Sequence, residues 1–150
     1  MSAIEVDLRL RSPHWSRVTA SADTVNDGNG LWVRADHDCS DPTDPEVLAS
    51  HPGRLAAIQI DGDEVVLAQD RLRSWPLFWS LEDGVGGAQR LVISDDATLM
   101  REAVSTPRLD ARARREFLDA GFVTGSDTLL AGIHQTEQGT VVRIDRATGR

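Results

Sequence analysis

The chain has 150 residues, of which 40% are hydrophobic and 27% charged, and this is the composition of one globular domain. Sixteen basic residues stand against twenty-four acidic ones, so the formal net charge is −8, and every basic residue is arginine. An acidic chain repels phosphate backbones and anionic membranes, and the lack of lysine excludes both a P-loop and a Schiff-base lysine.

Most of the predicted regular structure is strand. Apolar and charged residues alternate over residues 4–11, which is typical of a strand with one face in water. The Asp-Gly-Asp sequence at 61–63 predicts a tight hairpin turn, and the Gly-rich stretches 26–30 and 83–87 predict looser turns. The other predicted strands cover residues 15–20, 31–35, 55–60, 64–68, 77–80, 91–94 and 140–144.

Capping residues predict three short helices. Asp44, followed by proline, predicts the start of the first helix, and Asp95 or Asp96 predicts the start of the second. Asp110 predicts the cap of the third helix, which Gly121 ends in a left-handed conformation. Residues 122–135 are expected to be irregular. Many antiparallel hairpins with a few helices predict an α+β fold.

Short acidic and thiol motifs predict no metal site and no disulfide. The acidic loop 36–41 fails as an EF-hand, because the sixth and twelfth positions from Asp36 are Asp41 and Val47 rather than glycine and a carboxylate. A solvated loop is the better interpretation. Cys39 is the single cysteine and has no partner within the chain.

The arginine-rich and aromatic motifs are also interpreted as structural. Arg112, Arg114 and Arg115 alternate with acidic residues on a predicted helix, which favours i,i+4 ion pairs on a solvated face over a nucleic-acid site. Tryptophans are found in the core more often than on ligands, so we expect core positions. The tryptophans in question are Trp32, Trp75 and Trp79.

Four sequence blocks within residues 53–145 form a larger pattern. LAQDRLRSWPLFW at 67–79, which contains Asp70 and Arg71, resembles the ARDRxGxxPLYY stretch of the asparagine synthetase family's N-terminal domain. The other three blocks are similar to that domain in the same order and spacing. They are GRLAAI at 53–58 (GxFAFAIWD), VISDD at 92–96 (FASE) and FLDAGFVTGSDTLLAGI at 117–133 (YLxxGYVPGxxTLFxGIxxLPPG).

The resemblance implies a class II glutamine amidotransferase domain with the N-terminal-nucleophile (Ntn) hydrolase fold, a sandwich of two antiparallel sheets flanked by helices. In intact members an N-terminal cysteine hydrolyses glutamine, and the ammonia passes to a synthetase domain that adenylates a carboxylate and forms an amide. β-Lactam synthetases and lasso-peptide cyclases keep the domain as a scaffold without using glutamine. The charged face of residues 4–11 predicts either an edge strand or a missing helical layer. The segment between this strand and Gly53 is short for the family, which favours a trimmed helical layer.

The resemblance fails at the catalytic residues. The family begins Met-Cys-Gly-Ile and this chain begins Met-Ser-Ala-Ile, so Ser2, exposed by removal of Met1, is the candidate N-terminal nucleophile. A hydroxyl is a weaker nucleophile than a thiol, and the family's glutamine-holding motifs RGPD and NGEIYN have no counterpart here. Asp44, in a stretch similar to SDTEV, is the candidate binding residue. Asp70 and Arg71 belong to the family motif and are expected to be structural.

We therefore expect a single glutaminase-like domain over residues 1–150, without the synthetase domain. It is expected to lack glutaminase activity and to scaffold or regulate a separate ATP-dependent amide ligase, on which ATP and magnesium would bind. No metal or cofactor is expected in this chain, and a homo-oligomer is a further possibility. The first residues lack the charged-then-apolar pattern of a leader sequence, and no apolar run comes near the roughly 18 residues of a membrane span, so a cytoplasmic location is expected. Two alternatives stay open: an amidohydrolase that uses Ser2, and a binding or oligomerisation module on the same fold.

Overall fold

A computed structural model describes residues 4–18, 29–83 and 87–150 of the chain. Within these ranges the strands form a four-stranded sheet, in the order β1-β7-β6-β8, and a five-stranded sheet, in the order β2-β3-β4-β5-β9. The strands are β1 (Glu5–Arg9), β2 (Ser16–Val18), β3 (Gly30–Ala35), β4 (Leu55–Asp61), β5 (Glu64–Gln69), β6 (Phe78–Asp83), β7 (Gln89–Ser94), β8 (His134–Gln135) and β9 (Val141–Asp145). The helices are α1 (Pro45–Ser50), α2 (Ala97–Ala103) and α3 (Ala111–Ala120).

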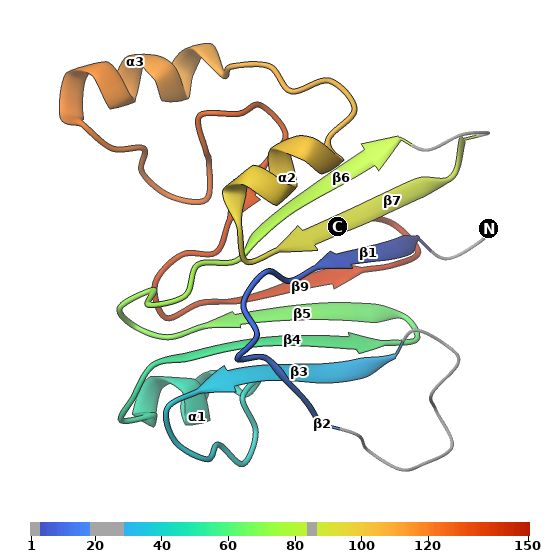
Figure 1. Cartoon of the computed structure of the whole chain (residues 1–150), viewed down its shortest axis with the longest axis vertical. Helices are drawn as coiled ribbons and strands as arrows, with labels where there is room; N and C mark the ends of the chain where they lie inside the picture. Colours follow the sequence, from blue (N-terminus) through green and yellow to red (C-terminus); the bar gives the residue numbers. More distant parts are fainter. Residues whose placement is uncertain (1–3, 19–28, 84–86) are drawn as a thin grey trace.

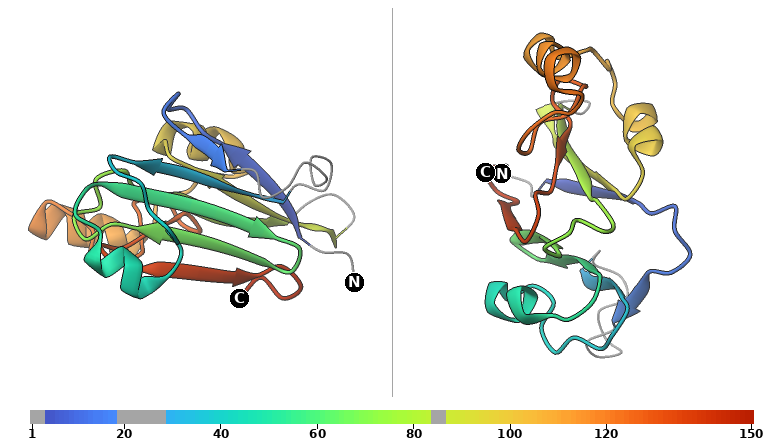
Figure 2. Two further views of the ribbon diagram at one scale, coloured as in Figure 1. Left: turned by 90° about the horizontal axis from the view of Figure 1, so that it is seen from below. Right: turned by 90° about the vertical axis from the view of Figure 1, so that its left-hand side faces the viewer.

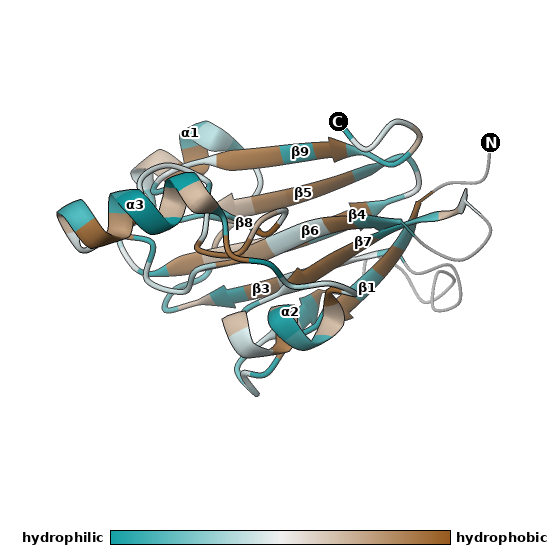
Figure 3. Cartoon of the chain, turned by 90° about the horizontal axis from the view of Figure 1, so that it is seen from above, coloured by the Kyte–Doolittle hydropathy of each residue, from teal (hydrophilic) through white to brown (hydrophobic). Residues whose placement is uncertain are grey.

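The two sheets stack face to face around one hydrophobic core (Figures 1 and 2). Ile58 and Leu67 of the five-stranded sheet belong to the same buried cluster as Leu91 and Ile93 of the four-stranded sheet. Alternate residues of β4 face the other way, and there Ala57 packs with Leu48 of α1. Figure 3 shows this arrangement as apolar residues concentrated along β5, β7 and β9.

Short helices cover the outer faces of the sandwich. The outer face of the four-stranded sheet packs through Val92 against Met100 and Ala103 of α2, and α1 covers the outer face of the other sheet. α3 lies farther out than α2, at one end of the long axis (Figure 1). The chain is therefore an α+β protein with two mostly antiparallel sheets and few helices. None of the described helices is long and apolar enough to cross a membrane.

β1 lies at the edge of its sheet, which confirms one of the two predictions from its charged face. It runs parallel to β7, so the prediction of purely antiparallel sheets is wrong at this edge. The charged face is occupied by ion pairs, because Asp7 contacts Arg9 at 2.9 Å and Arg90 at 3.2 Å. Arg90 also donates to the carbonyl oxygen of Ala103 at 2.9 Å, which ties this edge to the end of α2.

The predicted helix caps and hairpins are confirmed. Asp44 accepts from the N–H of Glu46 at 2.8 Å, Asp96 rather than Asp95 caps α2, and Asp110 caps α3. Gly121 ends α3 with φ of 81°. Two differences are that β6 and β7 extend beyond the predicted residues, and that β8 lies within the stretch expected to be irregular. The predicted residues 19–20, 26–28 and 84–86 lie outside the described part of the chain.

The three tryptophans occupy the edge of the core rather than its centre. Each is half-buried and packs against the cluster between the sheets. Trp75 also lies under two guanidinium groups, with the Cζ atoms of Arg34 and Arg54 at 4.2 Å and 4.7 Å from its ring centroid. The core prediction therefore holds for their apolar rings, although Trp75 and Trp32 also contact arginine guanidinium groups.

Candidate functional site: the Asp70 turn and the apolar cleft

The Asp70 turn, which we define as residues 70–74, follows β5 and is organised by one buried carboxylate. Asp70 is only 4% exposed. Its Oδ2 accepts from the N–H of Leu55 at 3.0 Å and its Oδ1 accepts from the N–H of Leu72 at 2.7 Å. Both oxygens lie 3.3 Å from the N–H of Ser74. Because backbone donors use both oxygens, Asp70 holds the conformation of the turn rather than a ligand.

The two arginines of the turn differ in backbone conformation. Arg73 has φ of 52°, which makes it the one described non-glycine residue in the left-handed region. For a residue with a Cβ atom this conformation costs about 1–2 kcal/mol. Arg71 avoids that region and is exposed, and its side chain lies beside Gly139. The turn therefore places a charged side chain where its backbone favours glycine.

A buried polar network joins the turn to the other sheet. Gln69 is fully buried, and its Oε1 accepts from the hydroxyl of Thr136 at 3.0 Å. That hydroxyl oxygen accepts from the N–H of Leu77 at 3.3 Å, and the N–H of Thr136 donates to the carbonyl oxygen of Leu77 at 2.9 Å. Since buried polar groups cost free energy when unpaired, these bonds fix the segment after β8 against the start of β6.

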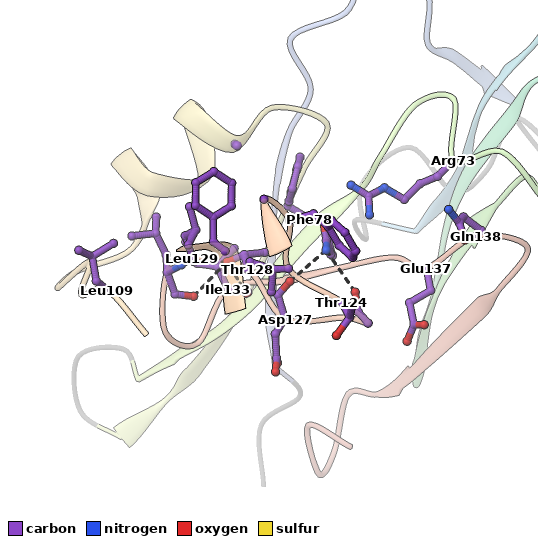
Figure 4. A pocket seen from close by; sticks show the side chains of 18 residues that line it. Arg73, Phe78, Leu109, Thr124, Asp127, Thr128, Leu129, Ile133, Glu137 and Gln138 are labelled. Atoms are coloured by element: carbon purple, nitrogen blue, oxygen red, sulfur yellow. Dashed lines mark hydrogen bonds between the residues drawn. The ribbon is translucent and has the colours of Figure 1, made fainter. Parts of the chain in front are cut away.

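An apolar cleft of about 850 Å³ lies beside this network, between β6, α3 and the segment 121–138. Figure 4 shows Arg73, Glu137 and Gln138 at one end of the cleft and Leu109 and Leu129 at the other. The cleft thus has one polar end and one apolar end. Its apolar walls include Phe78, Leu109, Phe117, Phe122, Leu130 and Ile133.

Polar groups in the middle of the cleft are already bonded within the chain. The amide of Gln135 donates to the carbonyl oxygens of Gly125 at 3.1 Å and Asp127 at 3.0 Å. The hydroxyl of Thr128 lies 2.8 Å from the carbonyl oxygen of Ile133. The described lining residues include no cysteine, histidine or serine, and the hydroxyl of Thr124, which lines the cleft, donates to the carboxylate of Glu116. Apolar walls with a few polar groups are typical of a binding cleft.

The helix that borders the cleft is poorly covered. Ala113 is the one residue of α3 that is buried. Large apolar side chains on and around this helix are between 44% and 71% exposed, namely Phe117, Leu118, Leu109 and Phe122. A loosely packed helix that presents exposed aromatic and aliphatic residues is a surface typical of protein contacts.

The predicted ion pairs on α3 are wrong. None of Arg112, Arg114 and Arg115 lies within ion-pair distance of a carboxylate in the described part of the chain. Glu116 instead accepts from both the hydroxyl and the N–H of Thr124, which folds the segment after the helix back onto it. Among the described residues these three exposed arginines therefore have no ion-pair partner.

The structure does not bring the predicted site residues together. Ser2 lies outside the described residues. Asp44 caps the six-residue helix α1 and is used by the N–H of Glu46. Asp70 and Arg71 lie in the turn described above, and unlike Arg73 neither of them lines the cleft. Neither Arg73 nor Thr136 was predicted as a site residue. The signal that could have singled out Arg73 is its place on the glycine of the block ARDRxGxxPLYY.

The loop 36–41 is held by structural contacts. Asp36 accepts from Nε of Arg54 at 2.8 Å and from its Nη2 at 3.0 Å, and these bonds hold the pKa of Asp36 below its ordinary value. Cys39 lines a second, more polar cavity of about 550 Å³ together with His37. Burial raises the pKa of the Cys39 thiol, so it is not an activated nucleophile. Among the described residues no three His, Cys, Asp or Glu side chains are placed to hold a metal ion.

The sequence was compared with protein-family models and with curated proteins. No protein-family model matches the chain, and no curated protein matches it in sequence.

Proposed function

We propose that this chain is a non-catalytic glutaminase-like domain that scaffolds or regulates a separate asparagine-synthetase-like, ATP-dependent amide ligase. The proposal rests on the resemblance of four sequence blocks and on where those blocks lie in the structure. ATP and magnesium would bind to the partner, which would also form the amide. This chain would contribute a folded surface, and we place it with the Ntn-hydrolase-like domains.

The layered architecture supports this assignment. Two stacked sheets with a helix on each outer face match the arrangement that the resemblance implies. The blocks fall on consecutive structural parts: β4, then the Asp70 turn with β6, then β7 with the cap of α2, then α3 with the cleft segment. Each block thus covers a part that shapes either the core between the sheets or the cleft.

The observation that carries the proposal is the conformation of the Asp70 turn. In the family stretch ARDRxGxxPLYY, the glycine falls on Arg73 of this chain. Arg73 is the described non-glycine residue with a left-handed backbone, at φ of 52°. A glycine is the residue that such a backbone favours. The match between a family glycine and a left-handed residue is independent of side-chain similarity, and it supports the register of the block.

The contacts nearest the beginning of the described chain tie it to the end of β9 and the β4–β5 turn. Ile4 is two residues after Ser2, and its carbonyl oxygen accepts from Nε and Nη2 of Arg146 at 3.2 Å and 3.1 Å. Nη1 of the same arginine donates to the carbonyl oxygen of Gly62 at 2.8 Å. All three guanidinium nitrogens donate to backbone carbonyl oxygens, so Arg146 has a structural role.

Reconstitution with a synthetase-type chain tests the proposal. The partner to use is the asparagine-synthetase-like protein, lacking its own glutaminase-like domain, that is encoded nearest to this chain. Affinity pull-down with purified proteins should recover a complex, and amide formation from free ammonia should depend on this chain. No complex, together with full synthetase activity in its absence, would refute the proposal.

A glutaminase assay separates the scaffold from the amidohydrolase alternative. The isolated chain and the complex should release no glutamate from glutamine, and Ser2→Ala should leave this background unchanged. Glutamate release that disappears in Ser2→Ala would overturn the non-catalytic role and favour an N-terminal serine nucleophile.

A further inference from the structure

We infer that the synthetase-type partner docks on the apolar cleft and α3, placing an apolar anchor side chain between β6 and α3 and a carboxylate opposite Arg73. This inference rests on the proposed function and names the surface and the chemistry of the contact. It follows from three independent observations: the extent of the exposed apolar surface, its local charge, and the unpaired arginine at its polar end.

The apolar surface extends beyond what a small molecule in the cleft would cover. Phe117 and Phe122 line the cleft, but Leu118 is 71% exposed and does not line it. Leu72, in the Asp70 turn beside the polar end, is 82% exposed. A ligand of cleft size would leave both leucines in water, whereas a protein surface laid across the cleft and its borders would cover them. Exposed apolar groups that continue past a pocket favour a protein partner.

The local charge differs from that of the rest of the chain. Residues 70–74 and 108–138 carry six arginines and six carboxylates, so the net charge of −8 lies entirely outside this surface. A second copy would bring another acidic body against the first, and long-range repulsion would oppose that association. The free arginines of α3 favour a partner whose contacting surface is apolar with acidic borders.

Arg73 supplies the specific polar contact. Its side chain lines the polar end of the cleft, and no carboxylate lies within ion-pair distance of it in the described residues. Its backbone is held in a conformation that favours glycine, so the charged side chain is present at a conformational cost. Glu137 and Gln138 border the same end and would accept or donate hydrogen bonds at the rim. A partner carboxylate would therefore be directed to Arg73.

Binding measurements on matched variants test this surface. The purified synthetase-type chain is titrated with the full-length protein by calorimetry. Phe117→Asp and Leu118→Asp should each weaken binding at least tenfold, which corresponds to about 1.4 kcal/mol. Both side chains are exposed, so folding should be retained, and far-ultraviolet circular dichroism checks it. Val18→Asp is the control, because Val18 is 48% exposed on β2, at the opposite end of the molecule (Figure 1).

A charge reversal tests the polar end separately. Arg73→Glu should weaken binding at least tenfold and reduce its dependence on salt, whereas Arg71→Glu, in the same turn but outside the cleft lining, should change binding by less than threefold. A complex that forms equally well with every cleft variant would overturn the docking surface and leave the scaffold function standing. A wild-type chain that binds no synthetase would overturn both.

Sedimentation of the isolated chain tests whether a second copy of this chain, rather than the synthetase-type partner, covers the surface. The docking proposal expects a monomer at micromolar concentration. A dimer that Phe117→Asp converts to a monomer would assign the surface to a second copy of this chain and overturn the proposal.

Discussion

Replacing Asp70 by asparagine is expected to destabilise the fold severely. The carboxylate accepts from the N–H groups of Leu55, Leu72 and Ser74 at 2.7–3.3 Å while only 4% exposed. Asparagine keeps one acceptor oxygen and turns an N–H donor toward one of these backbone donors. Hydrogen bonds to a charged group contribute roughly 1.5–3 kcal/mol each, so losing one and leaving its donor unpaired should cost about 2–4 kcal/mol.

Urea denaturation followed by tryptophan fluorescence measures this loss. With an m value of about 2 kcal/mol/M, in the middle of the usual range, the midpoint for Asp70→Asn should fall by about 1–2 M. Asp63→Asn, at an exposed turn position, removes the same charge and should shift the unfolding free energy by less than about 0.5 kcal/mol. If Asp70→Asn stayed within that same margin of wild type, the carboxylate would not organise the turn.

Three further predictions concern backbone strain, acid stability and thiol reactivity. Arg73→Gly should leave the free energy of unfolding unchanged or raise it by up to about 1 kcal/mol, because glycine relieves the left-handed strain. Arg71→Gly, at a position without that strain, should lower the free energy of unfolding. Equal losses of stability for the two variants in urea denaturation would contradict this. The hydrogen bond from Arg11 holds the pKa of Asp96 below its ordinary value. Its contribution is present above the unfolded-state pKa of about 3.9 and is lost as the pH falls through the lower folded-state value. The stability difference between wild type and Asp96→Asn should thus be constant from pH 5 to about 8 and shrink below about pH 4, as denaturation at each pH would show. Because burial raises the pKa of the Cys39 thiol, iodoacetamide should label it more slowly than it labels glutathione at pH 7.5. Labelling of the folded chain as fast as that of glutathione would contradict this.

Local signals were sufficient to predict most elements of this fold. A cap or a tight turn depends on a few adjacent residues, so Asp110 and Gly121 bounded α3 correctly and the Asp-Gly-Asp turn gave the β4–β5 hairpin. The alternating charges of β1 predicted either an edge strand or a missing helical layer, and the structure shows the edge strand. Its parallel pairing with β7 was not predictable, because alternation shows that one face is wet but not which distant strand it joins or in which direction.

The candidate site was harder to predict because it depends on contacts between distant segments. Gln69 and Thr136 are 67 residues apart and carry no chemical motif, yet their buried hydrogen bond joins the end of β5 to the segment after β8, beside the cleft. The left-handed backbone of Arg73 could not be read from an arginine, a residue that rarely adopts it. The ion pairs predicted on α3 are wrong because helical spacing shows only which side chains on the helix can meet. It does not show that Glu116 instead accepts from Thr124, which lies beyond the end of the helix.

The most direct test of the scaffold role is sedimentation velocity of an equimolar mixture with the purified synthetase-type chain. We expect one faster boundary that contains both proteins, and we expect it to disappear with Leu118→Asp but not with Val18→Asp. Two boundaries, each sedimenting as its protein does alone, would contradict the central claim that this chain is the folded partner of a separate amide ligase.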